Sequence, residues 1–501
     1  MYEISLLISA LCLIGVTFYF VRQPSFSIYH PLGLYIIVHG LLFVVRPIVG
    51  DILHYSALYT IYDFTPSLED RLTVIYAANL CFLCFSFFSL RVGNMPMTFR
   101  FDRYDGEERR RLSQVFVWTL VLVMPIGLYS LMTSYNDLAG GENVKGMLID
   151  HASGYSFNTE SNGYLTDAQG MLGPCAALII WMGRFRLLSW FPLAGFILFK
   201  AGTGGRGPFV LALLMAGLLY CFENRRRFPP TSVIVAAAAG LLLFTTIGAD
   251  RGATLRELFG QKVTVDADAL HDEWNKQKFL ESMDWANMEY FEYLVYVIPH
   301  KSGTHDYFLD NFQLFTDPIP RVFWTEKPKG EPFRKIFLFN YGNPVGMTRS
   351  LPGEGWYALG WFGVIIWSSL WGYVTGSVYR RFAASEQTTM QTCSYMIFWT
   401  ALVIFYRDGL LVTLMHNLGV YLAPVALWYI FARLFAVPKA AQLRREAKLA
   451  ARRAEQLSAN ADLTPADLAK RNAQSYMASL PAAVRRRRLA LQGQPTTPPS
   501  A

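Results

Sequence analysis

The chain has 501 residues, of which 53% are hydrophobic and only 16% are charged. Soluble domains carry about 25% charged residues, and long apolar runs recur here, so the composition predicts a polytopic membrane protein. It excludes a soluble enzyme, a disordered scaffold and a nucleic-acid-binding module. The net charge of +8 does not indicate nucleic acid, because twelve Lys/Arg against four Asp/Glu between Lys439 and Ala501 account for all of it.

About eleven apolar runs are candidates for crossing a bilayer, whose core needs about 20 residues of helix. In chain order they are Ile4–Val21, Leu32–Gly50, Leu72–Leu90, Gln114–Met132, Ala168–Gly183, Leu187–Phe199, Pro208–Phe222, Thr231–Ile247, Trp356–Tyr379, Thr389–Tyr406 and Leu410–Phe435. The sixth and seventh are short and flank a glycine-rich segment, which predicts a broken helical hairpin. The first run ends without a small-residue cleavage site, so we interpret it as a retained span.

Basic residues in the short loops predict the orientation, because Lys and Arg concentrate on the cytoplasmic side. With eleven spans, all basic loops fall on the side of the C-terminal tail: Arg91–Arg111, Arg184 and Arg186, Arg225 to Arg227, and Arg380 and Arg381. The N-terminus is then periplasmic and the C-terminus cytoplasmic. We expect an N-terminal transmembrane bundle (1–249), a periplasmic loop or cap (250–355), C-terminal transmembrane helices (356–437) and a basic cytoplasmic tail (438–501).

Several patterns favour packing over chemistry. The six cysteines lie in apolar runs and are typical of small core residues, the Cys81-x-x-Cys84 pair included. Gly372 and Gly376 form a G-x-x-x-G pattern typical of close helix packing. Within the cap, the aromatic and apolar run Trp285–Ile298, with Glu289 and Glu292, predicts a helix that lies flat at the membrane interface.

Charged residues gather at the predicted outer ends of the spans. An Arg within the apolar slab costs roughly 2.5–3.5 kcal/mol on insertion scales, so it faces a partner or a cavity. Guanidinium groups match phosphate oxygens bidentately, so several of them predict an anion site. The alternative is that each snorkels or pairs locally, Arg46 with Asp51 and Asp250 with Arg251. The residues are Arg46, Asp51, Arg206, Asp250, Arg251, Arg349, Glu354 and Arg407.

The segment Gly202-Thr-Gly-Gly-Arg-Gly-Pro208 predicts a phosphate-binding turn. Its glycines allow the backbone to expose N–H groups, Pro208 suits the first turn of the next helix, and Arg206 adds a full positive charge. The segment is not a Walker loop, because no Lys-Ser/Thr follows. A plain turn between two helices is the alternative interpretation.

A second motif, Ile319-Pro-Arg-Val-Phe-Trp-Thr-Glu-Lys-Pro-Lys329, projects Arg321, Lys327 and Lys329 from a backbone fixed by prolines. Arg349-Ser-Leu-Pro-Gly-Glu-Gly355 then leads into a span that we expect to begin near Trp356. Glu354, just before it, is either a carboxylate that favours the helix N-terminus or a general base that takes a proton from an attacking hydroxyl. Asp250 and a histidine remain rivals for the base.

The histidines do not predict a metal site. His39 and His416 are interpreted first as hydrogen-bonded residues of the bundle, with a catalytic role as the alternative. His271, His300 and His305 in the outer loop do not match a known metal-ligand spacing. We find no P-loop, which argues against a nucleotide-driven enzyme and gives no reason to expect a cofactor.

The order of these motifs is similar to one family. A G-x-G-G-R-G-P between two short spans, D-R-G at Asp250 to Gly252, I-P-R-x-x-W-x-x-K-P and S-x-x-G-E together resemble the bacterial oligosaccharide repeat-unit polymerases (Wzy-type) of O-antigen, capsule and exopolysaccharide synthesis. In motif detail the resemblance covers roughly Lys200 to Gly376. It implies a polytopic, metal-independent glycosyltransferase fold of the GT-C type in the bacterial inner membrane.

The resemblance implies that undecaprenyl-pyrophosphate-linked oligosaccharides are the substrates and that a growing glycan is transferred to the incoming repeat unit on the periplasmic face. It implies that Arg206, Arg251, Arg321, Lys327, Arg349 and Arg407 bind pyrophosphate or glycan, with Glu354, Arg321 and Arg206 catalytic. A chain-length regulator and a flippase are the implied partners besides the lipid bilayer. Two alternatives stay open: an O-antigen ligase-like enzyme, for which His300 and His305 are candidates, and a transporter or flippase of lipid-linked sugars.

Overall fold

The computed structural model describes residues 1–101, 106–139, 147–149, 156–158, 163–202, 207–235, 285–320, 323–327, 331–342 and 348–437, with isolated positions such as 280, 281 and 344 and several between 442 and 455. Residues Met1–Ala436 form one compact unit and Val437–Ala501 a second. Arg206, Asp250, Arg251, His271, Arg321 and Lys329 lie outside the described residues, as does most of the predicted span 231–247.

The described chain is helical apart from one antiparallel pair of three-residue strands, β1 (Met147–Ile149) and β2 (Ser156–Asn158). Six helical segments in it are long and apolar enough to cross a membrane. They are α1 (Tyr2–Val21), the continuous run of α2 (Pro31–His39), η1 (Gly40–Val45) and α3 (Arg46–Leu53), α5 (Leu68–Gly93), α6 (Glu107–Ala139), α16 (Ser350–Ala384) and α18 (Leu411–Leu434).

Three shorter apolar helices accompany the six spans: 168–182, which combines η2 (Ala168–Met171) with α8 (Leu172–Met182); 187–200, from η3 (Leu187–Trp190) into α9 (Phe191–Gly202); and α10 (Gly207–Glu223). The 20-residue helix α17 (Thr389–Asp408) lies among them and carries several Thr, Tyr and Trp side chains. A polytopic membrane protein is therefore supported, while the count of eleven spans stays a prediction.

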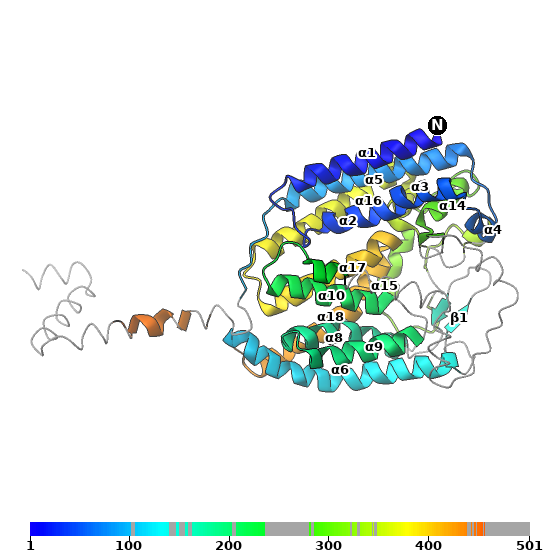
Figure 1. Cartoon of the computed structure of the whole chain (residues 1–501). Helices are drawn as coiled ribbons and strands as arrows, with labels where there is room; N and C mark the ends of the chain where they lie inside the picture. The colour runs from blue at the N-terminus through cyan, green and yellow to red at the C-terminus, as the bar shows by residue number, and fades with distance from the viewer. Residues whose placement is uncertain are drawn as a thin grey trace, which may run out of the picture. The chain divides into compact units, whose positions relative to one another are not determined.

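Loops that the sequence assigns to one side of the membrane lie together in the described chain. At one end of the bundle are α4 (Ala57–Tyr62), α14 (Asn287–Val297) and β1 (Figure 1). At the other end, the Tyr29 hydroxyl donates to the Arg226 carbonyl, and the amide of Arg100 donates to Gln387 at 2.8 Å. The grouping of the loops agrees with the predicted alternation of spans.

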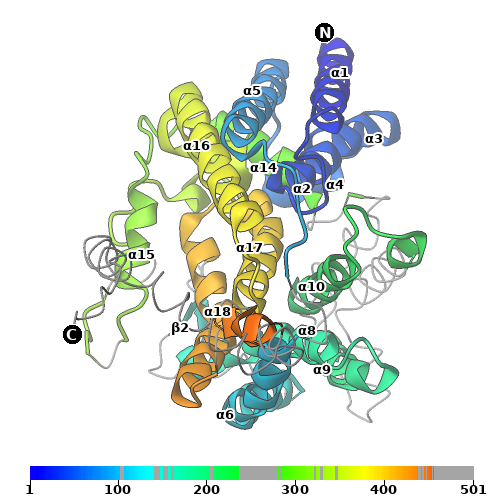
Figure 2. The ribbon, with the colours of Figure 1, turned by 90° about the vertical axis from the view of Figure 1, so that its left-hand side faces the viewer.

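The helix pair α5 and α16 packs unusually closely because its contact is lined by small residues. An added Cβ at Gly372 would lie 2.5 Å from the Phe85 carbonyl oxygen, and one at Gly376 would lie 2.6 Å from that of Ser89. The two helices run side by side in both views (Figures 1 and 2). The interpretation of Gly372 and Gly376 as a helix-packing motif is confirmed.

Helix α16 is broken one quarter of the way along. Leu359 and Gly360 have non-helical backbone angles, and Gly360 lies at φ +59°, ψ −137°, which an L side chain rarely adopts. The first part, 350–358, therefore changes direction before the second part, 361–384, and Gly355 packs directly on the backbone of Gly363. The helix begins at Ser350 rather than near Trp356, so Glu354 lies within it and not before it.

Two expectations about buried groups are wrong. Nearly every residue of α14 is buried, including Glu289 and Glu292, so the run 285–298 packs inside the fold and does not lie flat on a membrane. His39 is also buried but has no hydrogen-bond partner for either ring nitrogen; it stacks on Phe82 with ring centroids 4.3 Å apart. All six cysteines are free and buried or half-buried, as the apolar runs predicted.

We predict that Gly372→Ala lowers the stability of the protein by about 1–3 kcal/mol, because the methyl group would overlap a backbone carbonyl that cannot move away. Thermal unfolding of the detergent-solubilised protein measures the effect. Gly195→Ala is the matched control: it also lies inside a helix, but an added Cβ would meet nothing within 4 Å. There, the better helix propensity of Ala should leave stability unchanged or raise it. Equal melting temperatures for both variants would contradict the close α5–α16 contact.

Candidate functional site

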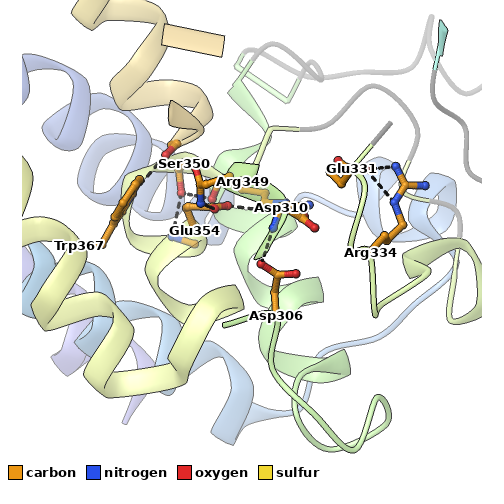
Figure 3. Close-up of polar contacts among 11 residues, drawn as sticks. Asp306, Asp310, Glu331, Arg334, Arg349, Ser350, Glu354 and Trp367 are labelled. Atoms are coloured by element: carbon orange, nitrogen blue, oxygen red, sulfur yellow. Dashed lines mark hydrogen bonds and ion pairs between the residues drawn. The ribbon is translucent and has the colours of Figure 1, made fainter. Parts of the chain in front are cut away.

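A buried arginine held between two carboxylates forms the centre of the candidate site (Figure 3). The Arg349 guanidinium donates to Asp310 at 2.6 Å and to Glu354 at 3.0 Å, and all three side chains are almost fully buried. Its charge also lies 3.7 Å from the centroid of the Tyr357 ring. Asn311 donates to the second oxygen of Glu354 at 3.3 Å. We call Asp310, Arg349 and Glu354 the Arg349 cluster.

Glycine and asparagine bring three chain segments to this cluster. Gly409 lies at φ +76°, and an added Cβ there would overlap the Ser350 carbonyl and lie 3.0 Å from the Glu354 Cβ, so no side chain fits. The amide of Asn287 on α14 donates to the carbonyls of Thr348, at 3.1 Å, and of Arg407, at 2.8 Å. The turn between α17 and α18 and the start of α16 are thereby fixed beside each other.

A further acidic residue, Asp306, lies next to the cluster on the loop that precedes α16. The backbone amide of Asp310 donates to one carboxyl oxygen of Asp306 at 3.1 Å. Burial, together with the neighbouring charge of Asp310, raises the pKa of the Asp306 carboxyl to about 8. The backbone of Asp306 and Tyr307 also donates to the carbonyls of Tyr357 and Ala358, which end the first part of α16. The loop therefore supplies hydrogen bonds to the carbonyls at the break in α16 and places a protonatable carboxyl next to the cluster.

Helix α14 carries two more buried carboxylates, each with a different partner. Glu289 forms an ion pair with Arg46 at 2.6 Å, so the predicted Arg46–Asp51 pair is wrong, and Asp51 is exposed. Glu292 accepts a hydrogen bond from the Tyr59 hydroxyl at 2.6 Å, while its other oxygen has no partner. Burial raises the pKa of Glu292 to about 8, so this carboxyl is mostly protonated at neutral pH.

The structure brings some of the predicted site residues together. Arg349 and Glu354 form one ion pair, and Arg407 lies on the neighbouring turn, with a side-chain Nε that is buried and without a hydrogen-bond partner. Lys327 instead donates to the carbonyls of Asp317 and Ile319, at 3.1 and 3.2 Å, across its own loop. Whether Arg206, Arg251 and Arg321 join the cluster lies outside the described residues.

His416 lies apart from the cluster and is half exposed. Its Nε2 lies 3.5 Å from an Asp167 oxygen. The expectation that His416 is a hydrogen-bonded residue inside the bundle is therefore wrong. Nearby, Lys200, which lies six residues before Arg206, donates a hydrogen bond to the Gln169 side chain at 2.7 Å. In the part of the chain that the structure describes, no three His, Cys, Asp or Glu side chains gather as a metal site.

The sequence motifs did not single out four residues of this site. They are Asp310, which belongs to the cluster, and Asp306, Asn287 and Asn311, which contact or support it. One signal could have found the acids: an arginine that is predicted to be buried at the end of a span needs a counter-ion nearby. That signal gives no single choice, because Asp306 and Asp310 are two of several acids on the outer loop that precedes Arg349, and Asp317, Glu326 and Glu331 lie nearer to it in sequence.

Comparisons with protein families, with curated proteins and with solved structures find no match to this chain.

We predict that Arg349→Met destabilises the protein by about 3–5 kcal/mol, because two buried carboxylates lose their counter-ion. Thermal unfolding in detergent measures the loss. A triple variant with Asp310→Asn and Glu354→Gln added should recover part of it, because the stranded charges are then removed. Arg111→Met, which breaks an exposed pair with Glu107, is the control and should cost less than about 1 kcal/mol. Equal effects at positions 111 and 349 would contradict the buried pairing.

We predict that Glu292→Gln reduces the loss of stability between pH 5 and pH 8. The folded-state pKa of about 8 lies above the ordinary value near 4.3. Stability from this group is therefore complete at low pH and declines by up to about 1.4 kcal/mol per pH unit until the folded pKa is reached. Melting temperatures across this range test the prediction. The exposed Glu386 supplies the control, and Glu386→Gln should show the same dependence of melting temperature on pH as the wild-type protein. If Glu292→Gln also matches the wild type, the prediction that the Glu292 carboxyl is buried and protonated is refuted.

Proposed function

We propose that this protein is a membrane glycosyltransferase that polymerises lipid-linked oligosaccharide repeat units. The reaction would take place at the membrane face that carries α14, the loop after it and the first part of α16. Two observations support the proposal: the sequence motifs resemble the repeat-unit polymerases, and the motif segment Arg349–Gly355 packs against the turn that carries Arg407, a further predicted cation of the site. The convergence of these segments carries the proposal.

In the proposed reaction, a hydroxyl of the incoming repeat unit attacks the anomeric carbon of the growing glycan. The bond between that carbon and the pyrophosphate oxygen breaks, undecaprenyl pyrophosphate leaves with the bonding electron pair, and a carboxylate takes the hydroxyl proton. Preorganised cations stabilise the charge that develops on the leaving group. Arg349 and Arg407 are the described candidates beside the cluster, and Arg206, Arg251, Arg321 and Lys327 are the further ones predicted from the sequence.

The pairing of Arg349 supports a specific role for Glu354. In the described state Glu354 is paired with Arg349 and fully buried, so it is shielded from a substrate hydroxyl. A pyrophosphate offers the guanidinium two strong acceptors and competes with both carboxylates. Substrate binding would then release Glu354 as the general base only when the leaving group is already bound, which protects the lipid-linked glycan from hydrolysis.

One observation favours the second candidate, a transporter of lipid-linked oligosaccharides. Helix α16 is broken close to buried ionisable groups, and discontinuous helices with such groups are typical of transporter binding sites. A ligase-like enzyme is the third candidate: His305 lies against the break at Gly360, with its Nδ1 buried and without a hydrogen-bond partner.

We predict that Glu354→Gln and Arg321→Ala abolish long glycan polymers in a strain that lacks the native gene. The variants are expressed at levels matched by membrane immunoblot, and the lipid-linked glycans are profiled by chain length. Single lipid-linked repeat units on the periplasmic leaflet are expected, because transport is intact and transfer is lost. Lys301→Ala, an exposed cation in the turn after α14, is the control and should give polymer of wild-type length.

The same profile separates the alternatives. Full-length polymer that stays on its lipid carrier in the Glu354→Gln strain would contradict polymerisation and favour a ligase. Repeat units that remain on the cytoplasmic leaflet would contradict both enzymes and favour a transporter.

A further inference from the structure

The loop between α14 and α16 exposes an unusual number of aromatic side chains. In the described residues 307–320, 323–327 and 331–337, which we call the aromatic segment, Phe323 is 82% exposed and Phe315 is 70% exposed. Tyr307, Phe312, Phe333 and Phe337 are each about half exposed. Large apolar side chains exposed together mark a surface that contacts something other than water.

Three of these aromatic side chains contact one another, and an exposed cation lies in the same segment. The Phe312 ring lies 6.2 Å from that of Phe315 and 5.6 Å from that of Phe333. The ammonium of the exposed Lys335 lies 4.9 Å from the Tyr307 ring centroid. The Arg334 guanidinium lies 5.7 Å from that of Phe337, but its side chain is only 9% exposed and is paired with Glu331. Aromatic rings with interspersed Lys and Arg are typical of the membrane–water interface, where rings sit at headgroup level and cations meet lipid phosphates.

The aromatic segment is continuous with the lipid-facing surface of the bundle. Its short helix α15 (Gln313–Thr316) packs on α18, and the Phe308 ring lies 5.2 Å from that of Trp367 on α16. Viewed along the bundle, α15 lies at the edge, outside α16, α17 and α18 (Figure 2). On α16, Phe362 is 76% exposed on a helix that is long and apolar enough to span the bilayer.

We propose that the aromatic segment lies in the headgroup region of the bilayer and docks this loop on the lipid surface. The apolar rings enter the boundary between headgroups and acyl chains, and the exposed Lys335 meets lipid phosphates. The sequence assigned this role to 285–298, but that helix is buried within the protein. The loop that follows it has the exposed rings and the exposed lysine that such a role requires.

The position of the aromatic segment has a consequence for the cluster, which rests on the proposed function. Asp310 and Asn311 belong to the same segment that carries Phe312 and Phe315, so docking holds the Arg349 cluster near the depth of the lipid phosphates. The pyrophosphate of a polyprenyl carrier lies at that same depth. A lipid-linked substrate would then reach the cluster sideways from the membrane without leaving it.

Spin labels on the full-length protein in phosphatidylethanolamine–phosphatidylglycerol nanodiscs test the docking without any activity measurement. Cys12 and Cys84, the two half-buried thiols, are replaced by Ala, and single labels are introduced by Phe315→Cys and Phe323→Cys. Power saturation compares collisions with O2, which enters the bilayer, and with Ni(II)EDDA, which stays in water. We expect an O2-to-nickel ratio at both positions several-fold above that of an aqueous label.

Two labels elsewhere on the protein set the scale. Phe362→Cys on α16 reports the lipid value, and Lys301→Cys, an exposed cation in the turn after α14, reports the aqueous value. A nickel-dominated signal at position 315 or 323 would overturn the proposal. So would poor access of both reagents, because it would mean that protein, such as a second copy of this chain, covers the surface. Since the readout is collision depth, its failure is distinguishable from a failure of the proposed glycosyl transfer.

Discussion

The fold at one end of the bundle depends on the pairing of buried charge. Arg349 and Arg46 are almost fully buried, and a guanidinium in a low-dielectric interior is tolerated only where carboxylates neutralise it. Each partner comes from a distant segment: Glu289 lies on α14, and Asp310 lies on the loop that follows it. Because an unpaired partner costs several kcal/mol, the first ion pair holds α3 against α14, and the second holds the start of α16 against the loop that follows α14.

The same end of the bundle has more acid than base in its described interior. Glu292 and Asp306 add carboxyls whose raised pKa values keep them mostly protonated at neutral pH, which limits the repulsion among the buried acids. In the proposed reaction, Arg349 would exchange its carboxylate partners for pyrophosphate oxygens when the lipid-linked substrate binds. This behaviour suits a metal-independent transfer from a pyrophosphate carrier, the function that we propose.

Much of the fold could be predicted from the sequence, but less of the site. Hydropathy located the long spans, because length and apolar content are all that a bilayer requires, and Gly372 and Gly376 were correctly interpreted as packing residues. The long-range pairs could not be predicted: Asp51 is close to Arg46 in sequence, yet Glu289 binds it. Aromatic content alone placed 285–298 at the interface, since a single sequence cannot show that both faces of a helix are covered.

The break at Gly360 divides α16 into parts with different mechanical properties. The longer part packs closely along α5 through the contacts at Gly372 and Gly376, so its position relative to α5 is fixed. The shorter part carries Glu354, ends at a pivot and is held by hydrogen bonds from the Asp306–Tyr307 backbone. In the proposed reaction, any rearrangement would therefore be confined to about nine residues and their loop, while the longer part of α16 stays packed on α5.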